Sequence, residues 1–582
     1  MLPKLSVPGL NSSLDRFLTA LKPLLTPKEY KETVWITKKF AKEEGPILQE
    51  SLMKLSKVTE NWATHVWLHT RYLTNRTPLQ VTNGSSSIGK NINWVTKEDM
   101  LNTLSKYILY LTKLLRNIGA DKYPWERLNS VPFCTQQFKD MVGGHRLPGL
   151  KIDSYKYSPH SNHIVVMYAG SIYKVPVSTG DRIATLHEIY HLLSRVFEPR
   201  HEGASLGLLT ALDRDSWYTV REHLKLSPVN TASLTTIEEC LFGLCIDDSP
   251  SEGITTLMKQ SRFGDRKGNF QFFNRWYGIA TQTAFTGDGY YSWVSEHSMF
   301  DGGVIALFWD LSMTLDSTDP IIDGASTQLQ IERLQWEVTP FIASHLEVAR
   351  STLSKCYDKY DIHTFQFCNY GKDFVKNSGL YFHGYMQLAL QLAYYRSSQK
   401  LFTSYTPVGL TQFKGGRLEQ ARTTTLESVE FIMAMSGNRK YTRKDKFNLM
   451  AQATERHKII VTETSKGNVF LKHLQALEML EKDEGINSGF FKSKYFKIFA
   501  EPSLAAASVY SPVDGVGVYL PTAGEGYFMV FQPSNQHQLI DMAICGIADN
   551  SGNIPIAQFC ESIDKALMDM KALIITNNIS KL

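Results

Sequence analysis

The feature that most limits the fold is the irregular mixture of helical and strand-like patterns along the chain. Apolar residues recur at helical spacing near the start, as in Leu14, Phe17 and Leu21, and they alternate along residues 516–520 near the end. The two patterns never settle into the β-α-β-α rhythm of a parallel-sheet protein. We therefore expect a mixed α/β fold of the α+β kind.

Size and charge exclude several functional classes. The chain has 582 residues, 43% of them hydrophobic, which is enough for two or more domains with packed cores. Its 62 basic and 57 acidic residues nearly balance, so we expect no nucleic-acid partner. No uninterrupted apolar run approaches the length of a membrane-spanning helix, so we expect no transmembrane segment. The seven cysteines show no paired-ligand spacing, which argues against a disulfide framework.

Local patterns predict individual elements. Helices are predicted over residues 98–117, 181–196, 232–246, 327–360 and 385–396. Paired strands are predicted over residues 164–177, over 269–276 with 290–297, and over 516–520 with 527–531. The turn Gly287-Asp288-Gly289 would join the second pair.

The segment His187-Glu188-Ile189-Tyr190-His191 is one candidate for chemistry. It matches H-E-x-x-H, in which two histidines one helical turn apart bind zinc and the glutamate acts as a general base. The third ligand is not evident; candidates by residue type alone are Asp213, Asp215, Glu222 and Glu239. A helix with a solvated or packing face explains the same five residues, and a metalloprotease is the alternative that metal analysis would test.

His297 is the second candidate. It follows a predicted strand in the segment Glu296-His297-Ser298-Met299-Phe300-Asp301-Gly302. A histidine at a strand end can present one ring nitrogen to a cleft, and a nearby carboxylate can fix its tautomer or hold the loop. Histidines at strand ends are also often structural, so the spacing alone leaves both roles open.

Six further segments, in the order of the chain, resemble those of one enzyme family. They are Leu2-Pro3-Lys4-Leu5-Ser6-Val7-Pro8 with Leu14-Asp15-Arg16-Phe17-Leu18, Arg146-Leu147-Pro148-Gly149, Arg214-Asp215-Ser216-Trp217, Asn274-Arg275-Trp276, Gly371-Lys372-Asp373-Phe374-Val375-Lys376, and Gln387-Leu388-Ala389-Leu390-Gln391-Leu392-Ala393-Tyr394-Tyr395-Arg396. Together they resemble the choline/carnitine O-acyltransferase family over nearly the whole chain. His297 and Asp301 match its H-x-x-x-D-G motif, which implies that His297 is the catalytic base.

The resemblance implies two similar α/β halves, each like chloramphenicol acetyltransferase, with an active-site tunnel between them. We expect residues 1–75 to form a helical segment packed on the second half, residues 76–340 to form the half with the histidine motif, and residues 341–582 to form the half that binds CoA and carnitine. The resemblance also implies a monomer with no metal site and no permanently bound cofactor, because coenzyme A and acyl-CoA are substrates.

The implied reaction is direct acyl transfer without a covalent enzyme intermediate. His297 would take the proton of the acceptor hydroxyl, and the imidazolium would then protonate the leaving CoA thiolate. Asp301 would hold the loop. Lys372 and Lys376 match the family's phosphate-binding lysines and would contact CoA as point charges.

Three positions bear on the acceptor. Tyr405 matches the tyrosine that binds the carnitine carboxylate, whereas Leu418 replaces the threonine usual in carnitine enzymes and Lys472 replaces an arginine. Lysine keeps the charge but loses the bidentate fork. Choline has no carboxylate and needs no cation there, so Lys472 favours carnitine or another zwitterion, and choline is the alternative acceptor.

Two further positions bear on rate and on acyl length. The family's Ser-Thr-Ser motif falls on Ala505-Ala506-Ala507, followed by Ser508, which would substitute only after a shift by one residue. Loss of an oxyanion donor costs ~10²–10³-fold in rate, so a catalytically weakened acyl-CoA-binding protein is a second hypothesis. Gly517 stands where short-chain members have methionine, which favours a channel for a medium-chain acyl group; a bulge or turn glycine is the alternative.

The chain ends in Ser580, Lys581 and Leu582. At a free carboxyl terminus these residues are an address read by the peroxisomal import receptor, and they predict a location in the peroxisomal matrix. With the resemblance, they predict an enzyme close to the peroxisomal carnitine octanoyl- and acetyltransferases. Its reaction would be reversible transfer of a medium-chain acyl group between CoA and carnitine, in fatty acid metabolism.

Overall fold

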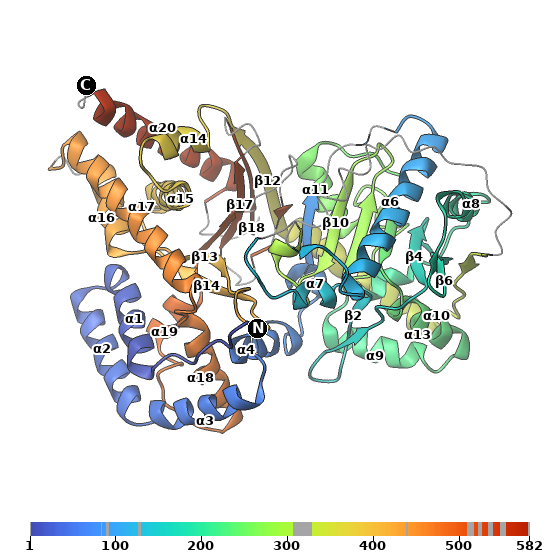
Figure 1. Cartoon of the computed structure of the whole chain (residues 1–582), viewed down its shortest axis with the longest axis horizontal. Coiled ribbons are helices and arrows are strands. Elements are labelled where there is room, and N and C mark those ends of the chain that lie inside the picture. The colour runs from blue at the N-terminus through green and yellow to red at the C-terminus, as the bar shows by residue number, and fades with distance from the viewer. Residues whose placement is uncertain are drawn as a thin grey trace.

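The computed structural model describes residues 2–82, 84–88, 92, 94–125, 130–305, 329–437, 440–508, 517–518, 520–521, 526–533, 539–547 and 554–579. Within them the chain forms two large sheets, one in each half of the molecule, with helices packed around them (Figure 1). The predicted mixed α/β class is therefore confirmed. Among the described residues, no helix combines the length and the apolar character needed to cross a bilayer.

The first half is built on an eight-stranded sheet with the strand order β11-β5-β4-β8-β9-β10-β1-β16. The strands are β1 (Gly84–Ile88), β4 (His163–Tyr168), β5 (Ser171–Pro176), β8 (Gly243–Ile246), β9 (Thr281–Phe285), β10 (Tyr291–Glu296), β11 (Glu332–Arg333) and β16 (Gly517–Val518). β8 runs parallel to β4 and β9, and the antiparallel β4–β5 pair confirms the first predicted hairpin. Two small ribbons lie beside the sheet: β2 (Gly144–Leu147) with β3 (Ser154–Tyr157), and β6 (Ser178–Thr179) with β7 (Arg182–Ile183).

Helices cover both faces of this sheet. They are α5 (Leu79–Thr82), α6 (Lys97–Gly119), α7 (Gln136–Asp140), α8 (Leu186–Phe197), the 3-10 helix η4 (Leu206–Ala211), α9 (Arg214–Leu224), α10 (Pro228–Glu238), α11 (Ile254–Phe263), the 3-10 helix η5 (Gly302–Ile305) and α13 (Pro340–Lys359). Helix α4 (Trp62–Trp67), which continues into the π-helix η2 (Leu68–Leu73), packs instead with the N-terminal helices. Strand β4 is buried throughout, and its side chains alternate between the two faces. Val165 and Met167 join the core formed with α9, α10, α11 and α13, whereas Ile164 and Val166 join the core formed with α6 and α8.

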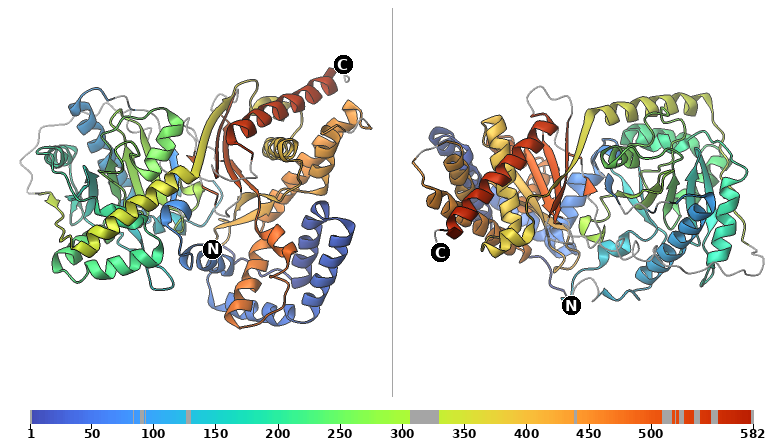
Figure 2. Two further views of the ribbon diagram at one scale, coloured as in Figure 1. Left: turned by 180° about the vertical axis from the view of Figure 1, so that it is seen from behind. Right: turned by 90° about the horizontal axis from the view of Figure 1, so that it is seen from above.

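The second half is built on a six-stranded sheet with the order β12-β18-β17-β15-β13-β14. The strands are β12 (Tyr360–Phe367), β13 (Ser404–Gly409), β14 (Leu418–Arg422), β15 (Leu504–Ser508), β17 (Tyr527–Pro533) and β18 (Ile540–Ile547). The helices are α14 (Lys372–Asn377), α15 (Phe382–Ser398), α16 (Leu426–Met435), α17 (Arg443–Ser465) and α20 (Ile556–Ile579). The right view of Figure 2 shows α15, α17 and α20 on the face of this sheet that points away from the first half.

The opposite face of the second sheet packs against the first half. Ile362, Val530, Ala543 and Cys545 are buried in the same apolar core as residues of α11 and α13. Burying apolar surface on both sides of the junction opposes relative movement of the halves. The site described below lies beside this junction.

The first three helices pack on the second half. These are α1 (Leu10–Leu21), α2 (Pro27–Lys42) and α3 (Gly45–Val58), with a short 3-10 turn η1 (Lys22–Leu24) between the first two. They share an aromatic core with α18 (Leu471–Asp483) and α19 (Lys494–Ala500), in which Phe40 stacks on Phe490 at 4.6 Å between ring centroids (Figure 1).

Two of the predicted strand pairs are wrong. Residues 269–272 form turns and residues 273–276 form no regular element, and the partner of β10 is β9, which starts later. The predicted hairpin over 516–531 does not form, because β16 pairs with β1 of the first sheet and β17 pairs with β15 and β18 of the second. An alternating pattern identifies a strand but does not identify its partner.

Candidate active site

His297 follows strand β10, which is buried along its whole length between β9 and β1. The chain leaves the sheet at this residue, so the imidazole projects beyond the strand end. The Tyr72 hydroxyl lies 3.4 Å from His297 Nδ1, and the two rings are nearly parallel. His297 keeps 14% of its side chain exposed, which leaves room for a substrate to reach it.

Tyr72 comes from the π-helix η2, a feature that is frequent at functional sites. Its backbone carbonyl accepts a 2.6 Å hydrogen bond from Arg146 Nη2, and its ring packs edge-on against Trp67. Burial raises the pKa of the Tyr72 hydroxyl, so this group stays protonated beside His297.

Asp301 anchors the loop that follows His297. Its carboxylate accepts hydrogen bonds from Arg417 Nε at 2.8 Å and Nη2 at 2.9 Å. The same guanidinium donates to the carbonyl oxygens of Ser298 at 2.6 Å and His297 at 3.1 Å. Asp301 Oδ1 is 3.9 Å from His297 Nδ1, which is too far for a hydrogen bond. The geometry therefore favours loop anchoring, with charge stabilisation at a distance, over proton transfer by Asp301.

The electrostatics keep His297 neutral. Burial lowers its pKa to about 4, the Asp301 charge opposes this shift, and the Arg417 charge adds to it. Burial alone would raise the pKa of Asp301, but the Arg417 guanidinium holds it below its ordinary value. At neutral pH the pair is a neutral imidazole near an ionised carboxylate, and such an imidazole can accept a proton.

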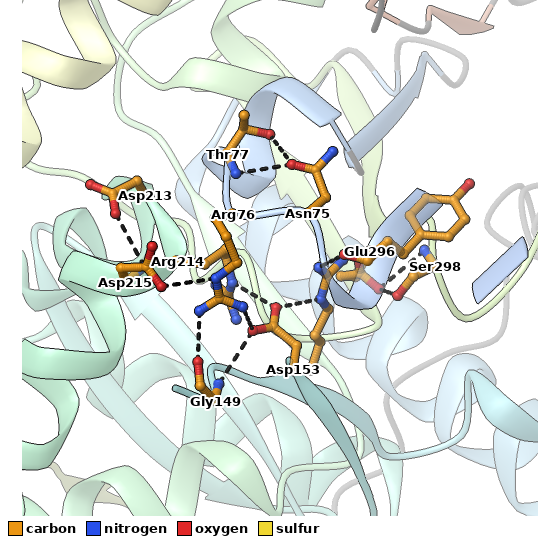
Figure 3. Close-up of polar contacts among 12 residues, drawn as sticks. Asn75, Arg76, Thr77, Gly149, Asp153, Asp213, Arg214, Asp215, Glu296 and Ser298 are labelled. Atoms are coloured by element: carbon orange, nitrogen blue, oxygen red, sulfur yellow. Dashed lines mark hydrogen bonds and ion pairs between the residues drawn. The ribbon is translucent and has the colours of Figure 1, made fainter. Parts of the chain in front are cut away.

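A buried ionic network fixes the residues on either side of His297 (Figure 3). Glu296 pairs with Arg146 at 3.0 Å and accepts hydrogen bonds from the backbone N–H and the hydroxyl of Ser298. Arg146 and Arg214 both donate to Asp153, at 2.8 and 2.7 Å. Charges buried this completely need such partners, so the network holds the strand end in one position.

Lys472 lies at the start of α18 and is fully buried. Its Nζ lies 3.2 Å from the centroid of the Trp67 ring and 3.4 Å from Gln475 Oε1. Its backbone N–H donates to Glu419 Oε2 at 3.1 Å. Burial lowers the pKa of Lys472, and the Glu419 charge only partly offsets this shift.

Tyr405 and Leu418 lie on the β13–β14 hairpin but at its opposite ends. Tyr405 pairs with Arg422, and Leu418 pairs with Gly409. The Arg422 guanidinium carbon is 5.8 Å from the Tyr405 ring centroid. Leu418 directly follows Arg417, so the hairpin that presents Tyr405 also supplies the cation that anchors the histidine loop.

Strand β15 shows where the predicted serine motif falls. Ala505 pairs with Tyr405, Ala507 with Val530, and Ser508 with Phe531. Ala507 is buried and Ser508 is exposed. Because neighbouring strand residues point to opposite faces, Ser508 can replace the Ala507 side chain only if the strand slips by one residue.

Two of the remaining predicted sites lie on α14 and β16. Lys372 and Lys376 are one turn apart on α14, where Lys372 is half-buried and Lys376 is exposed; Figure 1 shows α14 near α20 and far from α18. Gly517 is buried on β16 opposite Ser87. Ser580, Lys581 and Leu582 lie outside the described residues, so the peroxisomal address stays a prediction.

The H-E-x-x-H segment lies on α8, as predicted. Glu188 is engaged in the helix cap, since it accepts hydrogen bonds from the Thr185 N–H and from Arg182. Among the described residues, no group of three or more His, Cys, Asp or Glu side chains is placed to hold a metal ion. Glu188 thus has a structural role at the start of the helix.

Sequence reasoning missed Tyr72 and the anchoring role of Arg417. Tyr72 stands in the apolar stripe of the N-terminal helices, where its ring alone explains its presence. The signal that was available is the pair Arg71-Tyr72, which puts two polar groups next to each other within that stripe.

Comparison with known proteins places the chain in a family. The sequence model of the family described as Choline/Carnitine o-acyltransferase matches residues 5–565. The chain is 26% identical to the carnitine O-acetyltransferase of Columba livia, with 100% of this chain and 94% of that protein covered. It is also 26% identical to the choline O-acetyltransferase of Danio rerio, with 98% and 93% covered.

Among solved structures, the trichothecene 15-O-acetyltransferase from Fusarium sporotrichioides matches 88% of this chain and 93% of its own, with 10% identity and a TM-score of 0.42. The family match spans both sheets and includes the His297 loop, the Arg417 anchor and Lys472. The chain therefore belongs to the choline/carnitine O-acyltransferase family and is an acyltransferase.

Proposed function

We propose that this protein reversibly transfers an acyl group between coenzyme A and carnitine, with His297 as the general base. The observation that carries the proposal is the neutral imidazole of His297, held between the Tyr72 hydroxyl and the Asp301–Arg417 pair. A general base must be unprotonated at working pH, and burial ensures this here.

The proposed transfer begins and ends with a neutral imidazole. The imidazole takes the proton of the acceptor hydroxyl, whose oxygen forms a bond with the thioester carbonyl carbon. The C–S bond then breaks, and the thiolate takes the proton back from the imidazolium. The Asp301 carboxylate, 3.9 Å away, stabilises the imidazolium while it exists.

The remaining roles are part of the same proposal. Lys472 would attract the carnitine carboxylate and Tyr405 would orient it, while Lys372 and Lys376 would contact a CoA phosphate. Gly517, with no side chain, would leave space for a medium-chain acyl group. Choline is disfavoured as the acceptor because it has no carboxylate to pair with the buried Lys472.

One observation favours a weaker enzyme. Ala507 is buried on β15 and offers no hydroxyl to the oxyanion. Without such a donor the rate falls by ~10²–10³-fold, so a slow transferase or an acyl-CoA-binding protein is the second candidate.

The test is CoA release by the purified protein with acetyl-, octanoyl- or palmitoyl-CoA, each with carnitine or choline. We expect octanoyl-CoA with carnitine to give the highest rate. His297→Ala should lower it by ~10²–10⁴-fold without loss of acyl-CoA binding. The exposed His160→Ala is the matched control. Full activity in His297→Ala would refute the base, and acyl-CoA binding without turnover on any acceptor would favour the second candidate.

A further inference from the structure

Arg71 is a cation beside the site whose role the proposed reaction leaves unassigned. It lies on η2 between Trp67 and Tyr72, with its guanidinium carbon 6.0 Å from each ring centroid. Its side chain is half-buried. Among the residues that the structure describes, no carboxylate lies within ion-pair distance of Arg71.

Arg71 is the second cation on the same aromatic residue, because Lys472 Nζ contacts the Trp67 ring at 3.2 Å. The two carboxylates whose charges act on Lys472 are already engaged. Asp301 accepts two hydrogen bonds from Arg417, and Glu419 accepts the backbone N–H groups of Phe470 and Lys472. Among the described residues, the charged groups that act most on His297 and Lys472 are the cations Arg71, Arg417 and Arg422 and the carboxylates Asp301 and Glu419, so cations outnumber carboxylates here even without Lys472.

The charge of Arg71 reaches the groups that would surround an acceptor. Burial is the main cause of the shifted pKa values of His297, Tyr405 and Lys472. The Arg71 charge adds to the lowering of the pKa of His297 and Lys472 and opposes the raising of the pKa of Tyr405. Two cations in a water-poor site repel each other, and a bound anion would relieve this repulsion. The arrangement is what a site for an anionic group requires.

We propose that Arg71 binds, together with Lys472, an anionic group on the acyl acceptor, and so selects acceptors that bear a carboxylate. This inference rests on the proposed function. Lysine offers a point charge, whereas the arginine fork can donate two parallel hydrogen bonds to a carboxylate. The charge of Arg71 acts on His297, so an acceptor held at Arg71 would lie near the base.

The test measures acceptor selectivity in the full-length protein. Arg71→Gln removes the charge but keeps much of the side-chain volume, Arg71→Lys keeps the charge, and the exposed Arg195→Gln on α8 is the control. We expect Arg71→Gln to raise the KM for L-carnitine by ~10–100-fold, with a smaller change in kcat. Arg71→Lys should have a KM for L-carnitine between those of the wild type and Arg71→Gln. The KM for octanoyl-CoA and the turnover of choline should not fall.

Calorimetric binding of L-carnitine and choline separates this inference from the proposed function. If the wild type turns over neither acceptor, the proposed function fails. The role of Arg71 is still supported in that case if the wild type binds L-carnitine more tightly than choline and the Arg71→Gln variant does not. If Arg71→Gln binds and uses L-carnitine like the wild type, the inference is overturned while the function stands. If the wild type binds neither compound, or binds both equally, the inference is also overturned.

Discussion

The ion pair between Asp301 and Arg417 gives the sharpest test of how the catalytic loop is held. Both side chains are almost buried, with exposed fractions of 13% and 5%. Asp301→Ala removes two charged hydrogen bonds and leaves the guanidinium without its counter-charge. Breaking a buried pair in this way costs ~3–5 kcal/mol of unfolding free energy. Arg417→Met should be comparably destabilising, because the carboxylate and the carbonyls of His297 and Ser298 then lose their donor.

In the double variant Asp301→Ala/Arg417→Met, the unfolding free energy should fall by less than the sum of the losses in the two single variants. Neither unpaired charge remains, so we expect a coupling energy of ~2–3 kcal/mol. Urea unfolding of the wild type and the three variants, followed by circular dichroism, measures it. The kcat of the double variant should stay low, because nothing then holds the two loop carbonyls.

Two results would refute this reasoning. Additive costs in the double variant would mean that the two charges do not stabilise each other. Wild-type kcat in the double variant would mean that the position of His297 does not depend on Arg417.

Three more predictions use the CoA-release assay, and a fourth uses urea unfolding. The rate should stay constant from neutral pH down to about pH 5. Below that it should fall, because His297, whose pKa is about 4, becomes protonated. A loss of rate near pH 6.5 would contradict a buried base. The buried neutral imidazole also stabilises the fold above about pH 6.5, and this contribution should disappear as the pH falls toward that lower pKa. Gly517→Met should shift preference from octanoyl- toward acetyl-CoA, and an unchanged chain-length profile would exclude the channel. Ala507→Ser should raise kcat by up to ~10²-fold. Ala506→Ser is the control and should not raise kcat, because the residue 506 side chain packs into the helical core on the other face of the strand. Equal effects of the two substitutions would exclude an oxyanion role.

The fold class and several elements could be predicted because their signals are local. The hairpin at β4–β5 and the helix at α8 depend on residues within a few positions of each other. The destination of β16 could not be predicted, because its alternating pattern fits either sheet and only the packed chain decides.

In the candidate site too, contacts between residues near in sequence could be predicted and contacts between distant residues could not. His297 and Asp301 stand four residues apart, so their proximity was readable in the sequence. Arg417 and Tyr72 lie more than a hundred residues from Asp301 and His297, and only the junction of the two halves brings them together. Residue type alone predicts that a buried arginine has a partner, but it does not say which one.

Strand β16 has a consequence for how this protein can be divided. Residues of the C-terminal half complete the edge of the first sheet at β1, while the first three helices of the chain complete the core around α18 and α19. Each half is therefore completed by residues from the other end of the polypeptide. A fragment that stops after α13 would leave β1 with an open edge, which is a template for pairing between molecules, and would expose the aromatic face of α1–α3. Such a fragment should aggregate, whereas co-expression with the remainder of the chain should recover a folded pair.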